Sequence, residues 1–204
     1  AVIKAAGPGA EVIWGDGPRL REFAEKADWG GFSQLAAGNA KRLADGIRRG
    51  DALLFLQSSQ PRLLDGVPAE RVAELRRIGW EHIGPVAQQL VQGATNWAVA
   101  PAPIPSWAHA VYADLPSDQR LAALWQDVFT ATRINEPSPL AAWKLHLHLL
   151  QRECASLNQR RLRTLRYKGE GTDLSVALPP GHVWCTAQLA TKSGLPFVAN
   201  LPTE

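Results

Sequence analysis

Apolar residues in the first hundred positions form short continuous runs and, from Pro68, one long stretch with helical spacing. The runs Ala52–Leu56 and Asn96–Ala100 each predict a buried strand, the first of them fully buried. Helices are predicted over about 19–26, 34–49 and 68–91. Strand, helix and strand in this order favour a parallel sheet flanked by helices. The third helix is expected to place one side of its chain in the core: Val72, Leu75, Ile78 and either His82 or Ile83.

A further short apolar run, Glu11–Trp14, predicts a strand after Gly7-Pro8-Gly9. These glycines resemble the start of a dinucleotide-binding loop. Such a loop follows a strand and opens a helix, so that the helix N-terminus meets the pyrophosphate. Here the glycines precede the predicted strand, which favours a helix–strand turn instead.

Two more helices are predicted in the second half of the chain. Ser117 is a good N-cap for the first, and Ser138-Pro139 supplies a cap and a first-turn proline for the second. The second helix carries the strongest periodic signal in the chain, and Trp143 on its apolar stripe is predicted to be a core residue. The stripes comprise Leu121, Leu124, Trp125, Val128 and Phe129 in the first helix, and Leu140, Trp143, Leu147, Leu150, Cys154 and Leu157 in the second.

The pattern changes to period 2 near residue 160. Segments 163–168 and 173–178, joined by Gly169-Glu170-Gly171, predict a hairpin, and 183–187 with 197–199 continue a β-rich region. We therefore expect a domain boundary near residue 160, with an α/β domain over 1–160 and a β-rich region over 161–204.

Composition fits a folded protein rather than a disordered or membrane-spanning one. Of 204 residues, 46% are hydrophobic and 20% are charged, enough to form a core. The longest apolar runs fall far short of the ~20 residues that span a bilayer. Two cysteines form no disulfide framework and favour a reducing cytoplasm. The chain contains no Met, Ala1–Ala6 resembles the end of a helix, and 197–204 ends abruptly, so we expect a fragment of a longer protein.

Positive charge gathers in one segment of a chain whose net charge is only +3. The strip 160–168 is either a phosphate-binding surface, with Tyr167 as a stacking ring, or a solvated strand face guarded by cations. The second interpretation is favoured, because nucleic-acid proteins usually show a broader basic surface. The cations are Arg160, Arg161, Arg163, Arg166 and Lys168.

Histidine and cysteine residues offer no convincing metal or catalytic site. His146 and His148, two positions apart on a helix, point away from each other and cannot share one ion. Cys154 fits a small core position, and its spacing from Cys185 is not that of metal ligands. No Ser/His/Asp arrangement or Walker loop is present.

Several phrases in the second half resemble one family in their order along the chain. They are Leu124-Trp125 through Phe129, Thr132-Arg133, Glu136-Pro137 through Trp143, Leu157-Asn158, Leu165-Arg166-Tyr167, Gly171-Thr172-Asp173-Leu174, Leu178 through Trp184, and Pro196 through Glu204. Together they are similar to the thermophilic-type metallo-aminopeptidases, the family of aminopeptidase T and aminopeptidase S. The likeness covers most of the chain and is strong from about residue 121. The family usually has Gly-rich sequence between His182 and Pro196, where this chain has Cys185-Thr186-Ala187-Gln188.

The resemblance implies an activity and a site. Family members are about twice this length, tend to dimerise, and release N-terminal residues from peptides with two divalent ions, often zinc or cobalt. The resemblance therefore implies that 1–160 is the N-terminal α/β domain with its beginning missing, and that 161–204 is the truncated start of the β-rich catalytic domain. The first metal-site carboxylate lies in a phrase that ends here at Asn200–Glu204, so Glu204 or the acid expected after it is the ligand. The remaining ligands have no counterparts in this chain, which is expected to be inactive alone, and neither nucleic acid nor membrane is expected as a partner.

Two other function classes stay open on sequence alone. One is a non-catalytic α/β module that binds nucleic acid or anions through the strip 160–168, with binding that weakens steeply in salt. The other is a scaffold or dimerisation domain without catalysis.

Overall fold

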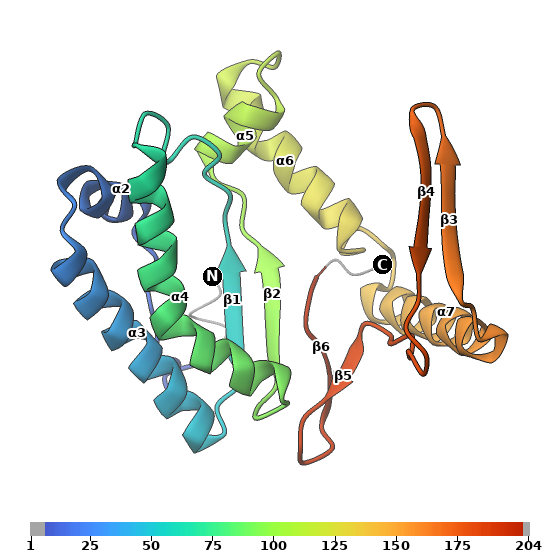
Figure 1. The fold of residues 1–204 in the computed structure, drawn as a ribbon. Helices are drawn as coiled ribbons and strands as arrows, with labels where there is room; N and C mark the ends of the chain where they lie inside the picture. The colour runs from blue at the N-terminus through green and yellow to red at the C-terminus, as the bar shows by residue number, and fades with distance from the viewer. Residues whose placement is uncertain (1–6, 202–204) are drawn as a thin grey trace.

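The computed structural model describes residues 7–201, which form helices and short strands (Figure 1). The helices are α2 (Gly17–Lys26), α3 (Trp29–Arg49), α4 (Ala69–Val91), α5 (Pro105–Val111), α6 (Ser117–Ala131) and α7 (Pro139–Arg160). The strands are β1 (Leu53–Gln57), β2 (Trp97–Pro101), β3 (Thr164–Gly169), β4 (Thr172–Ala177), β5 (Gln188–Ala190) and β6 (Pro196–Val198). The mixed α/β class expected from the sequence is confirmed.

Strands β1 and β2 form the predicted parallel pair, with Leu53 opposite Trp97 and Gln57 opposite Pro101. Helices α3 and α4 cover one face of this pair (Figure 1). The expectation that Ala52–Leu56 is fully buried is wrong, because Leu54 and Leu56 are 53% and 49% exposed. Alternate residues of a strand point to opposite faces, so these two leucines lie on the face that the helices leave uncovered. The covered face and its helices share a core of Ala40, Ile47, Val86, Leu90, Leu53, Phe55 and Trp97.

A second core lies where α2, α3 and α4 meet. Phe23 and Phe32 pack with ring centroids 5.7 Å apart, against Leu75 and Ile78 of α4. Leu75 and Ile78 thus occupy the core face that the apolar spacing predicts. Helix α3 begins five residues before the predicted start, because Asp28 caps it by accepting a hydrogen bond from the Gly31 amide at 2.9 Å.

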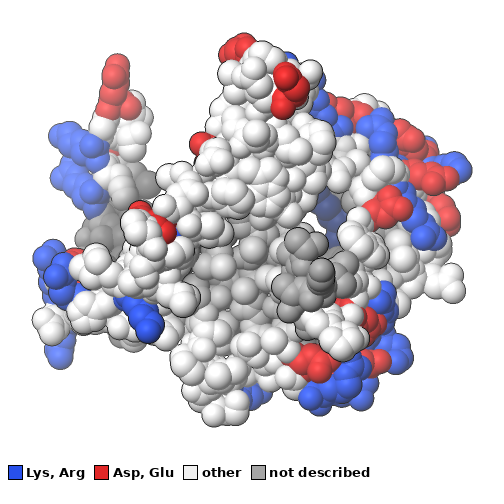
Figure 2. Space-filling view, turned by 180° about the vertical axis from the view of Figure 1, so that it is seen from behind, with Lys and Arg blue, Asp and Glu red and all other residues white. Residues whose placement is uncertain are grey.

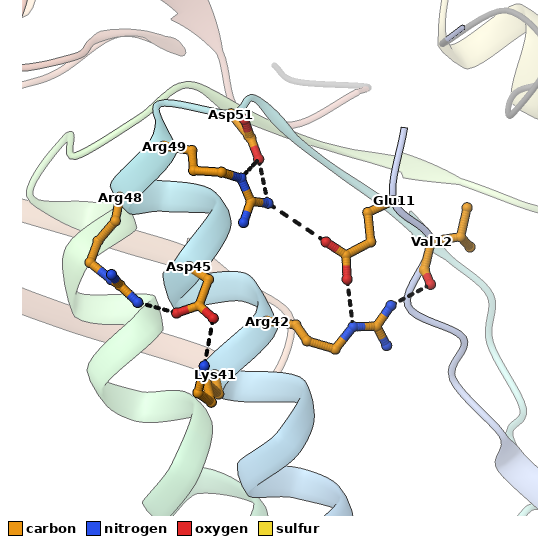
Figure 3. A network of polar contacts seen from close by, with 8 residues as sticks. All are labelled: Glu11, Val12, Lys41, Arg42, Asp45, Arg48, Arg49 and Asp51. Carbon is orange, nitrogen blue, oxygen red and sulfur yellow. Dashed lines mark hydrogen bonds and ion pairs between the residues drawn. The ribbon is translucent and has the colours of Figure 1, made fainter. Parts of the chain in front are cut away.

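The predicted strand over Glu11–Trp14 is wrong. This segment has no strand pairing in the described chain, and Trp14 is 76% exposed. Arg42 of α3 holds it through side chains instead, donating to a Glu11 carboxylate oxygen at 2.7 Å and to the Val12 carbonyl at 2.9 Å (Figure 3). The preceding glycines do form a turn, closed by a hydrogen bond from the Ala10 amide to the Gly7 carbonyl.

Helices α6 and α7 are found where the sequence predicts them, but their packing differs. Pro116, not Ser117, occupies the N-cap position of α6, and Ser138 precedes the first-turn proline of α7 without capping through its side chain. The apolar stripe of α7 is only partly covered: none of its residues is buried, and Leu140 is 79% exposed. Trp143 is therefore half-buried rather than a core residue.

The predicted hairpin is confirmed as β3 and β4, paired antiparallel from Thr164–Ala177 to Gly169–Thr172. It projects beside α7, and all but one of its strand residues are exposed (Figure 1). The predicted strand over 183–187 is wrong, because the backbone of Trp184 bonds the Asn158 side chain instead of a neighbouring strand. The strand β5 starts only at Gln188. Its partner β6 matches the prediction to within one residue.

Charged side chains gather at the margins of the molecule. Seen from behind, Lys, Arg, Asp and Glu lie over the hairpin and the helical side, whereas the middle is almost uncharged (Figure 2). No helix within residues 7–201 combines the length and apolar character needed to cross a bilayer.

Candidate functional site

The segment that leads to the expected metal ligand pairs with β2 of the parallel sheet through one bridge. Val99 of β2 donates its amide to the Ala199 carbonyl at 2.7 Å and accepts a hydrogen bond from the Leu201 amide at 2.9 Å. The bridge between Val99 and Asn200 is parallel, so this segment runs in the same direction as β1 and β2. Leu201, the last described residue, is therefore directed toward the carboxyl edge of the sheet, where open α/β sheets place their ligands.

Side-chain packing fixes this segment in place. Ala199 is buried, and the Phe197 ring meets Trp97 of β2 at a centroid distance of 6.3 Å. The turn before β6 rests on Gly93, whose carbonyl accepts the Lys192 amide at 2.8 Å. Gly93 has φ +72°, and a Cβ there would lie 3.0 Å from the Ala190 carbonyl oxygen, so glycine suits this contact.

Helix α7 holds the irregular loop that connects the two hairpins. The Asn158 side chain accepts the Trp184 amide at 2.8 Å and donates to the Trp184 carbonyl at 3.0 Å. The Cys154 thiol donates to the same carbonyl oxygen at 2.9 Å. Three polar contacts on one residue thus anchor the loop to the last turns of α7.

A cluster of a cation and two rings lies where α6 leads into α7. The Trp143 indole donates to the Thr132 carbonyl at 2.8 Å, and the Arg133 guanidinium lies 5.1 Å from the Trp143 ring centroid. Arg133 also contacts Nδ1 of His146 at 3.1 Å. His146 is half-buried and His148 exposed, so the two rings do not converge, as the helical spacing predicts.

An open depression of about 340 Å³ lies at the carboxyl edge of the sheet. It lies between the loop after β1 and helix α5, which follows β2. The nearby Tyr112 hydroxyl donates to the Asp127 carboxylate, which raises the pKa of Tyr112 above its ordinary value. The side chains that line the depression include Gln60, Arg62, Ser106 and His109.

The described residues do not make a metal site by themselves. No group of three or more His, Cys, Asp or Glu side chains in residues 7–201 is arranged to hold an ion. His82 bonds the Ser33 hydroxyl at 2.8 Å, and His182 bonds the Pro179 carbonyl at 3.0 Å, so both rings serve local structure. Glu204, the acid that the resemblance marks as a metal ligand, lies outside the described residues. A complete two-ion centre, which needs several carboxylate and imidazole ligands, does not fit residues 7–201.

The basic strip 160–168 lies on the surface of the α7 terminus and β3. All five of its cations are exposed, and Arg166 pairs with Asp173 across the hairpin at 3.2 Å. This arrangement matches a solvated strand face with a cross-strand ion pair. Anion binding by the strip stays a prediction.

Sequence reasoning missed two features of this region. Helix α5 follows a proline-rich stretch that suggests a linker, yet Pro105 stands at a first-turn position that suits helix initiation. The pairing of 199–201 with β2 was also missed, because an apolar run of three residues indicates extended structure but not its partner.

Comparison with known proteins gives a consistent result over the whole chain. Residues 1–204 match the family model described as thermophilic metalloprotease (M29). Aminopeptidase T of Thermus thermophilus is 36% identical over 193 residues, which are 95% of this chain and 47% of that protein. Aminopeptidase AmpS of Bacillus subtilis is 33% identical over the same shares of the two chains.

The structural comparison agrees. A solved structure described as wild-type AmpT from Thermus thermophilus matches with a TM-score of 0.86 and 35% identity, over 100% of this chain and 50% of that one. The chain thus spans about half the length of the relatives it matches.

Proposed function

Because the chain belongs to the M29 family of thermophilic metalloproteases, we propose that it forms the N-terminal part of a metal-dependent aminopeptidase. The observation that carries this proposal is the match of 95% of the chain to aminopeptidase T at 36% identity, with a common fold. Proteins this similar in sequence and fold over so much of a chain usually share a reaction class. The substrates are peptides with a free amino terminus.

The finer points of the proposal rest on the family resemblance. They are the use of two divalent ions, zinc or cobalt, the role of Glu204 or the acid after it as a ligand, assembly as a homodimer, and a cytoplasmic location. Since no metal site is found in residues 7–201, the other ligands are expected in the part of the relatives that this chain does not span. The described residues then contribute the frame, which is a parallel pair of strands and the segment 199–201 that is bonded to β2 and precedes Glu204.

The segment 199–201 gives this frame a physical role. A metal ligand must be held in place, because an ion needs three or four donors at fixed distances and angles. Val99 makes two backbone hydrogen bonds to the segment, and Phe197 packs against Trp97. These contacts hold the backbone of residues 199–201, which end three residues before Glu204 in the sequence.

A chain that continues beyond residue 204 as far as its relatives do provides the test. It should release the first residue of a peptide with a free amino group and leave the N-acetylated peptide intact. Cleavage of both peptides at internal bonds would contradict the aminopeptidase assignment.

Replacing Glu204 and the acid expected after it, singly, by Gln separates their roles. Loss of a metal ligand should lower both bound metal and rate, whereas loss of a general base should lower the rate alone. Metal content by elemental analysis and hydrolysis rates distinguish the two. If neither variant changes either quantity, the metal-site assignment is wrong.

A further inference from the structure

The two cysteines of the chain lie close together in the fold, although 30 residues separate them in the sequence. Cys154 is a half-buried residue of α7, and Cys185 is exposed in the irregular loop 182–186. The Cys154 sulfur lies 2.9 Å from the carbonyl oxygen of Trp184, the residue that is bonded directly to Cys185. A planar peptide places that oxygen roughly 2.8 Å from the Cα atom of Cys185. The Cys154 sulfur is therefore within about 6 Å of the Cys185 backbone.

This separation puts the two sulfurs within reach of each other. A cysteine sulfur lies about 2.8 Å from its own Cα atom, so rotation about χ1 can turn the Cys185 sulfur toward that of Cys154, to about 3 Å or less. A small shift of the loop then closes the gap to the bond length of about 2.05 Å. The Cys185 sulfur lies 3.9 Å from the Val183 carbonyl, a contact too weak to hold it. Because 182–186 has no regular secondary structure, small backbone adjustments there break no helix or ladder hydrogen bonds.

We propose that Cys154 and Cys185 form a reversible, peroxide-sensitive disulfide that ties α7 to the loop between the two hairpins. The proposal does not depend on the metal site or on the peptidase reaction. Disulfides in reducing compartments are usually transient and redox-sensing, which fits a pair of free thiols held within reach.

The exposure of the two thiols sets the order of the reaction. Cys185 meets the peroxide first, because it is the exposed thiol. Its thiolate attacks one peroxide oxygen, the O–O bond breaks, and hydrogen peroxide yields a Cys185 sulfenic acid and water. The Cys154 thiolate then attacks the Cys185 sulfur, the S–O bond breaks, and a second water leaves with the thiol proton. In total the two thiols lose two electrons to form the disulfide, and one hydrogen peroxide gains them and is reduced to two waters.

Asn158 positions this reaction. Its side-chain amide holds both backbone groups of Trp184 and lies 3.6 Å from the Cys154 sulfur as a donor. The loop therefore stays beside the attacking sulfur, and the cross-link reinforces an existing attachment. The cross-link would join α7 to the segment between β4 and β5.

Thiol counting and peptide mapping test the proposal on the 204-residue chain. Reduced protein treated with one equivalent of hydrogen peroxide should fall from two reactive thiols to none, and dithiothreitol should restore both. Five trypsin sites separate the cysteines, so peptides 153–160 and 169–192 should stay joined only in the oxidised sample. The oxidised protein should unfold a few degrees higher than the reduced protein, because the cross-link restricts the unfolded chain.

Single variants distinguish this reaction from general oxidation. In Cys154→Ser the Cys185 sulfenic acid should persist and react with dimedone, whereas in Cys185→Ser the Cys154 thiol should survive the same treatment. Cys185 is exposed, so Cys185→Ser tests the pair without disturbing the fold. The proposal is overturned if the wild-type chain keeps both thiols, oxidises without joining the two peptides, or forms disulfides only between molecules.

Discussion

At the scale of single residues, Trp143 shows what an apolar stripe predicts about a side chain and what it does not. The helical spacing correctly places this side chain on the inner side of α7, but it does not show how much protein lies opposite. Since α7 has no buried residue, Trp143 is held by its hydrogen bond to Thr132 and by Arg133 over its ring. The sequence could predict the side of the helix and not the degree of burial.

Trp143→Ala should therefore cost about 1–3 kcal/mol, less than the loss of a fully buried tryptophan. Trp80 is 66% exposed and serves as the matched control, because Trp80→Ala should change stability by under ~0.5 kcal/mol. Urea unfolding of both variants measures the difference. Equal losses in the two variants would contradict the contacts assigned to Trp143.

Asp45 provides a residue-scale prediction for pH. The hydrogen bond from Lys41, at 2.7 Å, is the main cause that lowers the pKa of Asp45 below its ordinary value, and Arg48 adds to it (Figure 3). A lowered pKa in the folded state contributes stability that is fully present above about pH 3.9, the pKa of an unfolded Asp. This stability is lost as the pH falls through the pKa of the folded state.

Asp45→Asn should therefore lose less stability than wild type between about pH 5 and pH 2. The comparison is urea unfolding across that range at low salt, since salt screens exposed pairs. Asp65→Asn is the control, because no ion pair of Asp65 is found among the described residues. If the free energy of unfolding falls equally with pH in wild type and in Asp45→Asn, the ion pairs of Asp45 do not stabilise the protein in solution.

At the scale of elements, position in the sequence is predicted well and boundaries less well. Parallel β1 and β2, helices α4, α6 and α7, and the β3–β4 hairpin all lie where apolar periodicity and turn residues place them. The errors have local causes. The Glu11–Trp14 run has strand-forming residues but no neighbouring strand, and Gly30-Gly31 suggests a break inside a helix that the Asp28 cap starts earlier.

Two glycines, one inside α3 and one just after its last residue, should change the stability in opposite directions when replaced by alanine. Gly50 ends the helix at φ +82°, where an added Cβ is strained, so Gly50→Ala should cost about 1 kcal/mol. Gly38 lies inside the helix, exposed, with no atom within 4 Å of a Cβ, so Gly38→Ala should add about 0.5–1 kcal/mol. Thermal unfolding of the two variants should shift the midpoint in opposite directions, and shifts of the same sign would refute the assigned helix end.

At the scale of the whole molecule, the candidate site depends on a contact that periodicity could not reveal. Residues 199–201 pair with Val99 across about half the chain, and their register is set by Trp97, Phe197 and the turn on Gly93. Sequence reasoning identified the segment through family resemblance and left its partner open. The fold explains why the segment matters: it runs parallel to β2 and toward the edge where such sheets bind ligands.

The most direct test of the aminopeptidase assignment compares two chains in one assay. An aminoacyl reporter is supplied with Zn²⁺ or Co²⁺ to the 204-residue chain and to a chain that continues as far as its relatives do, and bound metal and hydrolysis are measured together. The 204-residue chain should bind no metal tightly and release no product, whereas the longer chain should gain both. Metal-dependent hydrolysis by the 204-residue chain, or none by the longer one, would contradict the assignment of the site.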